Sequence, residues 1–253
     1  MVTNFCFIHP AFVFQSMPVL PSLPVFQFIS AFQFIPLEIT NWVTSAYIAF
    51  NRSLGFMIWN TFLAIIPWAI SLWIFRGRGS GVRNIGWWLG FAIFMAFLPN
   101  APYVLTDIIH LVKFIRQGAS MWTIVFIWMP QFFMFMLIGT EAYVLSLINM
   151  GKYLRKQGYA RWTNAMELSV HALCVFGIYL GRVPRFNSWD LITHPMSIAN
   201  FIATEMFRSQ ALTMMGVVFC VIALIYWPLK HLTLAVMLYW QSPEHRRALK
   251  QNL

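Results

Sequence analysis

The chain has 253 residues, of which 60% are hydrophobic and only 9% are charged. Soluble domains carry about 25% charged residues, so this composition excludes a soluble globular enzyme and a charged, disordered tail. Lysine and arginine number 17 against 7 aspartates and glutamates, a net charge of +10. In so apolar a chain, the distribution of these basic residues indicates first which side of a membrane each loop occupies.

The first 52 residues are the hardest to interpret. Residues 1–37 carry no charge, yet prolines interrupt every helix that they could form. No basic segment of the kind that begins a secretory signal peptide is present. Two alternatives stay open for residues 1–52: a weak additional span, or an apolar, proline-rich leader outside the fold.

Five apolar runs predict membrane-spanning helices. Four of them are free of charge over 21 to 24 residues, enough to cross a hydrocarbon core of about 30 Å. These four are residues 53–75, 84–106, 117–140 and 209–229. A shorter run over 168–181 becomes a full span if it begins near Asn164. We therefore predict an all-α, polytopic integral membrane helical bundle over residues 53–240, with a sixth span before it as the alternative and a basic tail over 241–253.

Lysine and arginine are unevenly divided between the two sides of this bundle. The loops 76–83 and 152–161 and the segment after Leu229 hold eleven of them, and the opposite loops hold six. The positive-inside rule places the richer side in the cytoplasm. This predicts a multi-pass protein of the inner (plasma) membrane with a cytoplasmic C-terminus and membrane lipid as a partner.

Two loops on the opposite, outer side combine prolines with ionisable residues. The first is LPNAPY at residues 98–103, followed by Asp107 and His110. The second is R..RFNSWD at residues 182–190, followed by His194. Ionisable groups close to the apolar zone need partners that offset their desolvation. We therefore predict that the two loops form an outward-facing polar pocket.

The predicted pocket binds or processes a lipid-borne or small polar substrate. A histidine beside a carboxylate can act as a general base, and arginine holds phosphate or carboxylate groups. The candidate catalytic residues are Asp107, His110, Asp190 and His194. The candidate substrate-binding residues are Asn100, Tyr103, Arg182, Arg185, Asn187 and Trp189.

Other interpretations of the same residues remain open. Arg182 or Arg185 can pair with Asp107 or Asp190 as a structural latch in a non-catalytic membrane subunit. A divalent cation is the weakest alternative, because aspartate and histidine at this spacing occur on any helix surface. We predict no cofactor and no nucleic-acid partner, since the chain has no phosphate-binding loop, metal motif or basic–aromatic face.

A second group of polar residues lies deeper in the predicted spans and consists of Glu141, Glu167 and His171. Glu167 and His171 are one helical turn apart. A buried carboxylate with a histidine can relay protons, which supports a transporter as an alternative function. The simpler interpretation is a set of interhelical hydrogen bonds that hold the bundle together.

The LPNAPY…TD..H and R..RFNSWD segments resemble the signature of a bacterial family of multi-pass membrane proteins, domain of unknown function 1361. The similarity extends from about Trp59 to Trp240 and leaves out the residues before about Ser53. It implies a helical integral membrane protein. It implies no reaction, because the family has no established activity.

Overall fold

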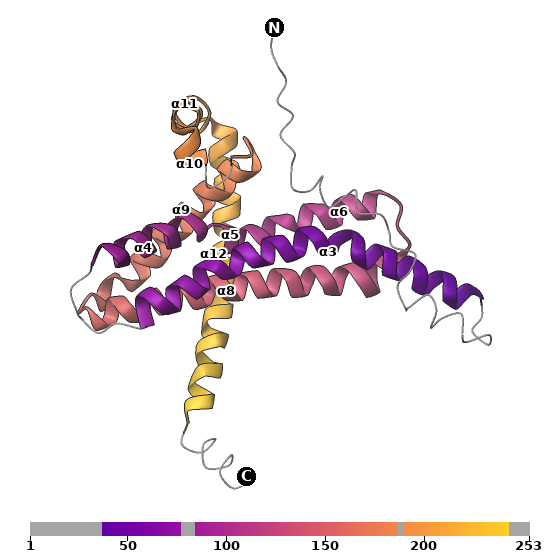
Figure 1. Cartoon of the computed structure of the whole chain (residues 1–253), viewed down its shortest axis with the longest axis horizontal. Coiled ribbons are helices and arrows are strands. Elements are labelled where there is room, and N and C mark those ends of the chain that lie inside the picture. Colours follow the sequence, from indigo (N-terminus) through magenta and orange to yellow (C-terminus); the bar gives the residue numbers. More distant parts are fainter. Residues whose placement is uncertain (1–36, 77–83, 187–189, 243–253) are drawn as a thin grey trace. The chain divides into compact units, whose positions relative to one another are not determined.

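The computed structural model describes residues 37–76, 84–186 and 190–242, and its regular elements over these ranges are all helices (Figure 1). These residues divide into two compact units. Unit 1 takes the described residues up to Asn60 together with Ile108–Phe135, and unit 2 takes Thr61–Asp107 and the described residues from Met136 onward. Each unit is presented separately below.

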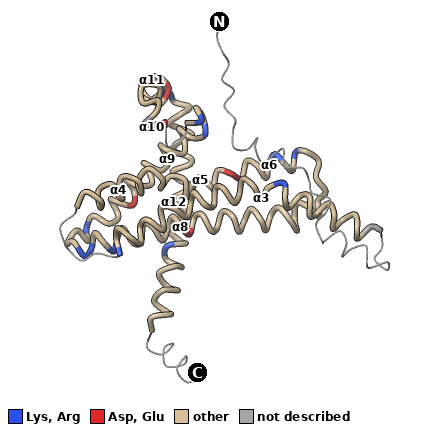
Figure 2. Tube along the Cα trace, in the orientation of Figure 1, with Lys and Arg blue, Asp and Glu red and all other residues tan. Residues whose placement is uncertain are grey.

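Among the described residues, five helical stretches are long and apolar enough to cross a membrane, which confirms the all-α membrane fold. They are Ile39–Arg76, Ile85–Arg116, Met121–Lys156, Ala160–Arg182 and Ser209–Gln241. Figure 2 shows that most of their length carries no lysine, arginine, aspartate or glutamate. Residues 1–36, which include most of the alternative sixth span, lie outside the described residues.

The first span is longer than its charge-free run. Helix α3 runs over Leu37–Ser71 and continues as a π-helix, η1, over Leu72–Arg76. Arg52, which we counted as a loop residue, is therefore inside a helix. Its guanidinium donates to the side-chain oxygen of Gln117 at 3.0 Å, within unit 1.

Unit 1 combines the N-terminal part of α3 with four further elements. They are α6 (Ile108–Arg116), α7 (Met121–Thr123), the π-helix η3 (Ile124–Trp128) and the beginning of α8 (Met129–Lys156). The widened π turn ends two residues before Pro130, which has no backbone N–H to continue a regular ladder. The Trp128 indole donates to the Ala49 carbonyl at 3.0 Å and so joins η3 to α3.

Unit 2 contains the rest of α3 and α8 and all the remaining elements. They are η1, α4 (Ile85–Phe97), α5 (Asn100–Tyr103), the 3-10 helix η2 (Val104–Asp107), the 3-10 helix η4 (Ala160–Trp162), α9 (Thr163–Arg182), α10 (Asp190–Thr193), α11 (Pro195–Glu205) and α12 (Ser209–Gln241). Figure 1 shows α10 and α11 beyond the C-terminal end of α9. Helices α9 and α12 pack against each other in this unit.

The second span is interrupted at the proline pair, Pro99 and Pro102. Helix α4 ends at Phe97 and α5 begins at Asn100. Pro99 and Pro102 have no N–H to donate, and the Ala101 N–H turns to the Leu98 carbonyl at 3.2 Å. The Asn100 side-chain amide donates to the Phe97 carbonyl at 3.0 Å. Asn100 therefore satisfies a carbonyl that the interrupted ladder leaves open.

Two glycines let the interrupted segment lie close to its neighbours. A Cβ at Gly177 in α9 would lie 2.8 Å from the Pro99 ring, and one at Gly139 in α8 would lie 2.6 Å from Val104. Real Cβ atoms do not approach so closely without displacing their neighbours. The absence of a side chain at both positions thus fixes where α5 and η2 pack, and with them the residues that follow.

Helix α12 is the least buried of the five spans, with 11% of its most apolar window buried. Its free cysteine, Cys220, is exposed, whereas Cys174 in α9 is buried. The charge-free run ends at Leu229, but the helix continues to Gln241, near the boundary at residue 240 that we predicted for the bundle. Lys230, which we counted with the basic residues of the cytoplasmic segment after Leu229, is therefore inside α12, and it is buried.

Candidate functional site

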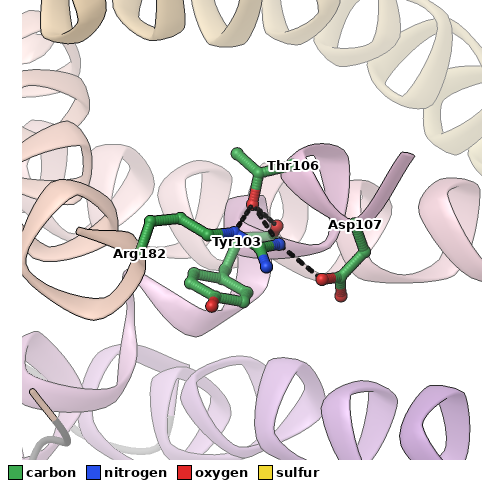
Figure 3. Close-up of polar contacts among 4 residues, drawn as sticks. All are labelled: Tyr103, Thr106, Asp107 and Arg182. Atoms are coloured by element: carbon green, nitrogen blue, oxygen red, sulfur yellow. Dashed lines mark hydrogen bonds and ion pairs between the residues drawn. The ribbon is translucent and has the colours of Figure 1, made fainter. Parts of the chain in front are cut away.

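Arg182 is the centre of a polar cluster at the C-terminal end of α9 (Figure 3). Its Nε and Nη2 atoms donate to Thr106 Oγ1 at 3.0 and 2.7 Å, and Nη2 also donates to Asp107 Oδ1 at 2.5 Å. The guanidinium carbon lies 4.3 Å from the centre of the Tyr103 ring, which adds a cation–π contact. Three neighbouring side chains thus fix the guanidinium in one position.

The carboxylate of Asp107 is buried by this arrangement. Its side chain is 1% exposed, while that of Arg182 is 20% exposed. A carboxylate at this burial needs a paired cation, and Arg182 supplies it. The 3-10 turn of η2 places Thr106 and Asp107 side by side, so that one guanidinium reaches both. Of the predicted pocket residues, the structure therefore brings together Tyr103, Asp107 and Arg182.

The chain that follows α9 has an unusual backbone at Arg185. Its φ angle is 62°, the one positive value among the described residues other than glycine. For a residue with a Cβ, this conformation costs about 1–2 kcal/mol. It lets the Phe186 N–H donate to the Leu180 carbonyl at 3.0 Å, which closes the end of the helix. The Arg185 side chain is exposed.

Asp190 and His194 contact each other, as their helical spacing predicts. His194 Nδ1 lies 3.7 Å from Asp190 Oδ1, and the Thr193 hydroxyl lies 2.9 Å from the same nitrogen. The His194 side chain is 59% exposed. His110 belongs to unit 1, where its ring lies 4.8 Å from that of Phe56. Asn187 and Trp189 lie outside the described residues.

The deeper polar group is built around an ion pair that we did not predict. Lys230 Nζ on α12 lies 2.5 and 2.7 Å from the two carboxylate oxygens of Glu167 on α9. The Lys230 and Glu167 side chains are 9% and 1% exposed. The predicted residue Glu167 is thus buried and paired with a cation from the last span.

His171 lies one turn deeper on α9 and bonds to a tyrosine. Its Nδ1 is 2.6 Å from the Tyr143 hydroxyl of α8, and its ring lies 4.6 Å from that of Tyr226 on α12. His171 Nε2 and the Tyr226 hydroxyl are buried without a hydrogen-bond partner in the structure. Buried polar atoms of this kind are rare in native proteins.

Glu141 has a different environment from the other two. The Thr233 hydroxyl of α12 lies 2.8 and 3.1 Å from its carboxylate oxygens, and the residue is half-buried. The three residues that the sequence groups together are therefore each bound by a different partner. Across the residues that the structure describes, no group of three or more histidine, cysteine, aspartate and glutamate side chains is arranged to hold a metal ion.

A family model described as "Protein of unknown function (DUF1361)" matches residues 59–225, about two thirds of the chain. The chain belongs to this family. The match includes both polar loops and all three of the deeper residues that the sequence singled out, but it ends before Lys230. Comparisons with curated proteins and with solved structures give no match.

In this DUF1361 protein, sequence analysis missed five residues of the two clusters: Thr106, Tyr143, Tyr226, Lys230 and Thr233. A signal existed for Lys230. The stretch after it, Leu232 to Trp240, is again apolar, so the lysine interrupts a hydrophobic run instead of ending it. A lysine in that position has to be paired or reach water. No comparable signal singles out Tyr143 or Thr106.

Proposed function

We propose that this membrane protein binds an anionic group, the phosphate of a lipid head group or of another small polar molecule, at the membrane surface through Arg182 and Arg185. The observation that carries the proposal is the fixed, partly exposed guanidinium of Arg182. Its Nε and Nη2 atoms are held by Thr106 and Asp107, and the plane is held by Tyr103. The Nη1 group makes no hydrogen bond to the described residues and is left for a ligand.

Arginine suits this task because its planar group presents donors in a fixed fork that matches phosphate oxygens. A guanidinium already held by three neighbours loses little conformational entropy on binding. Asp107 balances one positive charge, and the exposed Arg185 three residues later adds another. Glycine would adopt the positive φ angle at residue 185 without a steric cost. The presence of arginine there, in spite of that cost, supports a role for its side chain.

The latch remains the main rival interpretation, since the same contacts join α9 to η2. The anion site and the latch differ in their need for Arg185. The contacts that join α9 to η2 are made by Arg182 and do not include Arg185. The candidate catalytic roles of Asp107, His110, Asp190 and His194 stay predictions.

Retention of lipid by the purified protein tests the proposal. The detergent-solubilised protein is stripped of lipid, incubated with phosphatidylglycerol or phosphatidylcholine, and analysed by native mass spectrometry. We expect preferential binding of phosphatidylglycerol, weakened about tenfold by Arg182→Gln, the equivalent of about one charge-assisted hydrogen bond. Competition by inorganic phosphate distinguishes a free anion from a lipid head group as the ligand.

The decisive variant is Arg185→Gly, with Arg208→Gln as its matched control. Glycine removes the side chain and relieves the backbone, so the protein stays folded while binding weakens. Arg208 is exposed and pairs with Glu205 at 2.9 Å, so its loss leaves binding unchanged. Equal binding by the wild type, Arg182→Gln and Arg185→Gly would refute the proposal and favour the latch.

A further inference from the structure

We propose that Glu167 is a proton-binding residue of the membrane interior, and that the buried layer beneath it, formed by His171, Tyr226 and Tyr143, holds a water molecule that hydrogen-bonds within the site. Uptake of one proton by the carboxylate neutralises Glu167 and releases Lys230. The inference is independent of anion binding at Arg182, which involves the other end of α9.

The first argument is the cost of the ion pair. Both charges are buried among apolar helices, where ions are expensive and usually functional. A pair of well-packed apolar residues often stabilises a protein at least as well as a buried ion pair. Stability alone therefore gives little reason for a lysine and a glutamate at these two positions.

The second argument is the register of the two helices. Glu167 on α9 contacts Lys230 on α12. His171, one turn after Glu167, contacts Tyr226, which is one turn before Lys230. Within the described part of the chain, the two buried side-chain atoms without partners, His171 Nε2 and the Tyr226 hydroxyl, both belong to this second layer. An unsatisfied buried polar group costs about 1–3 kcal/mol. A buried water molecule bonded to both removes that cost.

The third argument is that a proton has a short path to the site. Helix α9 begins at Thr163, so Glu167 is about one turn, or about 6 Å, from its N-terminal end. His171 is about 6 Å deeper. The proton enters from the side of η4, reaches the carboxylate first, and meets the layer of His171 and Tyr226 behind it.

The fourth argument is that the released lysine has another place to bind. Lys230 Nζ lies 5.2 Å from the centre of the Trp227 ring and 5.6 Å from that of Tyr226. Aromatic faces stabilise a cation that has lost its carboxylate. Pro228, two residues before Lys230, lacks the N–H that would bond one turn back. Helix α12 therefore lacks one backbone hydrogen bond next to Lys230, the residue that changes its partner.

Few other titratable groups among the described residues face this site. Helix α8 contributes Tyr143, α12 contributes Tyr226 and Lys230, and α9 itself adds His171 and Cys174. At the rim, the last turn of α8 carries the exposed Arg155 and Lys156, and η4 carries the exposed Arg161. From α5, Tyr103 faces the opposite end of α9, near Gly181. Glu167 is the only carboxylate among these groups, but Glu141 is bound to Thr233, three residues after Lys230 on α12. Substitution of each residue in turn therefore has to separate the two carboxylates.

Infrared difference spectroscopy of the full chain in nanodiscs tests the proposal. Lowering the pH should produce the C=O band of a protonated carboxylic acid, and Glu167→Gln should remove it. Glu141→Gln is the matched control, because Glu141 is a second intramembrane carboxylate bound to α12, and it should retain the band. Loss of the band in Glu141→Gln with retention in Glu167→Gln would overturn the assignment.

Two further variants make the test independent of folding. Lys230→Met removes the counter-charge, so the band should already be present at neutral pH; its absence there contradicts the proposal. If Glu167→Gln does not fold, the balanced double variant E167Q/K230M takes its place and should lack the band. Tyr226→Phe removes one partner of the water and should shift the O–H stretching band of the bound water, whereas a water band identical to that of the wild type would refute the water.

Discussion

Lys230 on α12 and Glu167 on α9 form a bidentate ion pair, with Nζ at 2.5 and 2.7 Å from the two carboxylate oxygens. This pair joins the last span, which is otherwise little buried, to the preceding one. Because both groups are almost fully enclosed, neither can exchange its partner for water without movement of a helix. Breaking the ion pair therefore requires α9 and α12 to separate at this point in unit 2.

Removing one member of the pair should destabilise the protein strongly. Lys230→Met or Glu167→Gln alone leaves a buried group unpaired, and we expect each to cost up to about 3–5 kcal/mol. The double variant E167M/K230M leaves no buried charge at these two positions and should recover most of that loss. Thermal unfolding in detergent measures the effect.

The exposed pair of Arg208 and Glu205 provides the control for this cycle. Arg208→Gln should change stability by less than about 1 kcal/mol, because its side chain is 67% exposed and water replaces the partner. A double variant E167M/K230M as unstable as the two single variants combined would contradict the pairing.

The close packing of the interrupted second span predicts opposite effects for glycine substitutions. Gly177→Ala and Gly139→Ala should each destabilise the protein by about 1–3 kcal/mol, because the new Cβ meets Pro99 or Val104. A Cβ at Gly216 in α12 would meet nothing within 4 Å, so Gly216→Ala should stabilise the helix by up to about 1 kcal/mol. Thermal unfolding of the three variants side by side measures both signs. A loss of stability in Gly216→Ala equal to that of the others would contradict this packing.

Arg182→Lys should lower stability although the charge is kept. Lysine cannot reproduce the fork that bonds Thr106 and Asp107 together, and it loses the contact of the guanidinium plane with Tyr103. With the buried Asp107 only partly satisfied, we expect a loss of about 1–3 kcal/mol. Thr106→Val removes one acceptor and should cost less. An Arg182→Lys variant as stable as the wild type would show that the guanidinium geometry is not required.

The orientation of the protein can be tested with a reporter fused after Leu253. Lys230 and Arg52 lie far from the helix ends, and without them the two sides hold ten and five lysines and arginines. The positive-inside rule then places the C-terminus in the cytoplasm. A reporter that is active only in the cytoplasm should therefore be active, and one active only outside should not. The reverse pattern would invert the orientation.

The spans and the proline interruption could be predicted from sequence because both follow from local rules. A charge-free run of sufficient length crosses a membrane, and a proline pair interrupts a helix wherever it occurs. The extent of α3 could not be predicted in this way. Arg52 ends the apolar run but not the helix, since its side chain reaches Gln117 from within the helix.

The polar clusters could be predicted only in part, because partners depend on tertiary packing. Asp107 and Arg182 are 75 residues apart in the sequence. From charge alone, either Arg182 or Arg185 could have paired with either Asp107 or Asp190. Glu167 and His171 share a helix face and were found together. Their actual partners, Lys230 and Tyr143, come from other helices. The register between helices decides such pairs, and side-chain spacing within one span carries no information about it.

The low burial of α12 also gives the chain a natural attachment point for a probe. Cys220 is exposed on this helix, ten residues before Lys230, while Cys174 is enclosed. With Cys6 replaced by serine, a nitroxide attached to Cys220 would report the depth and mobility of α12 in the lipid. Its spectrum, recorded at several pH values, would follow the helix directly, without any substitution in the polar residues themselves.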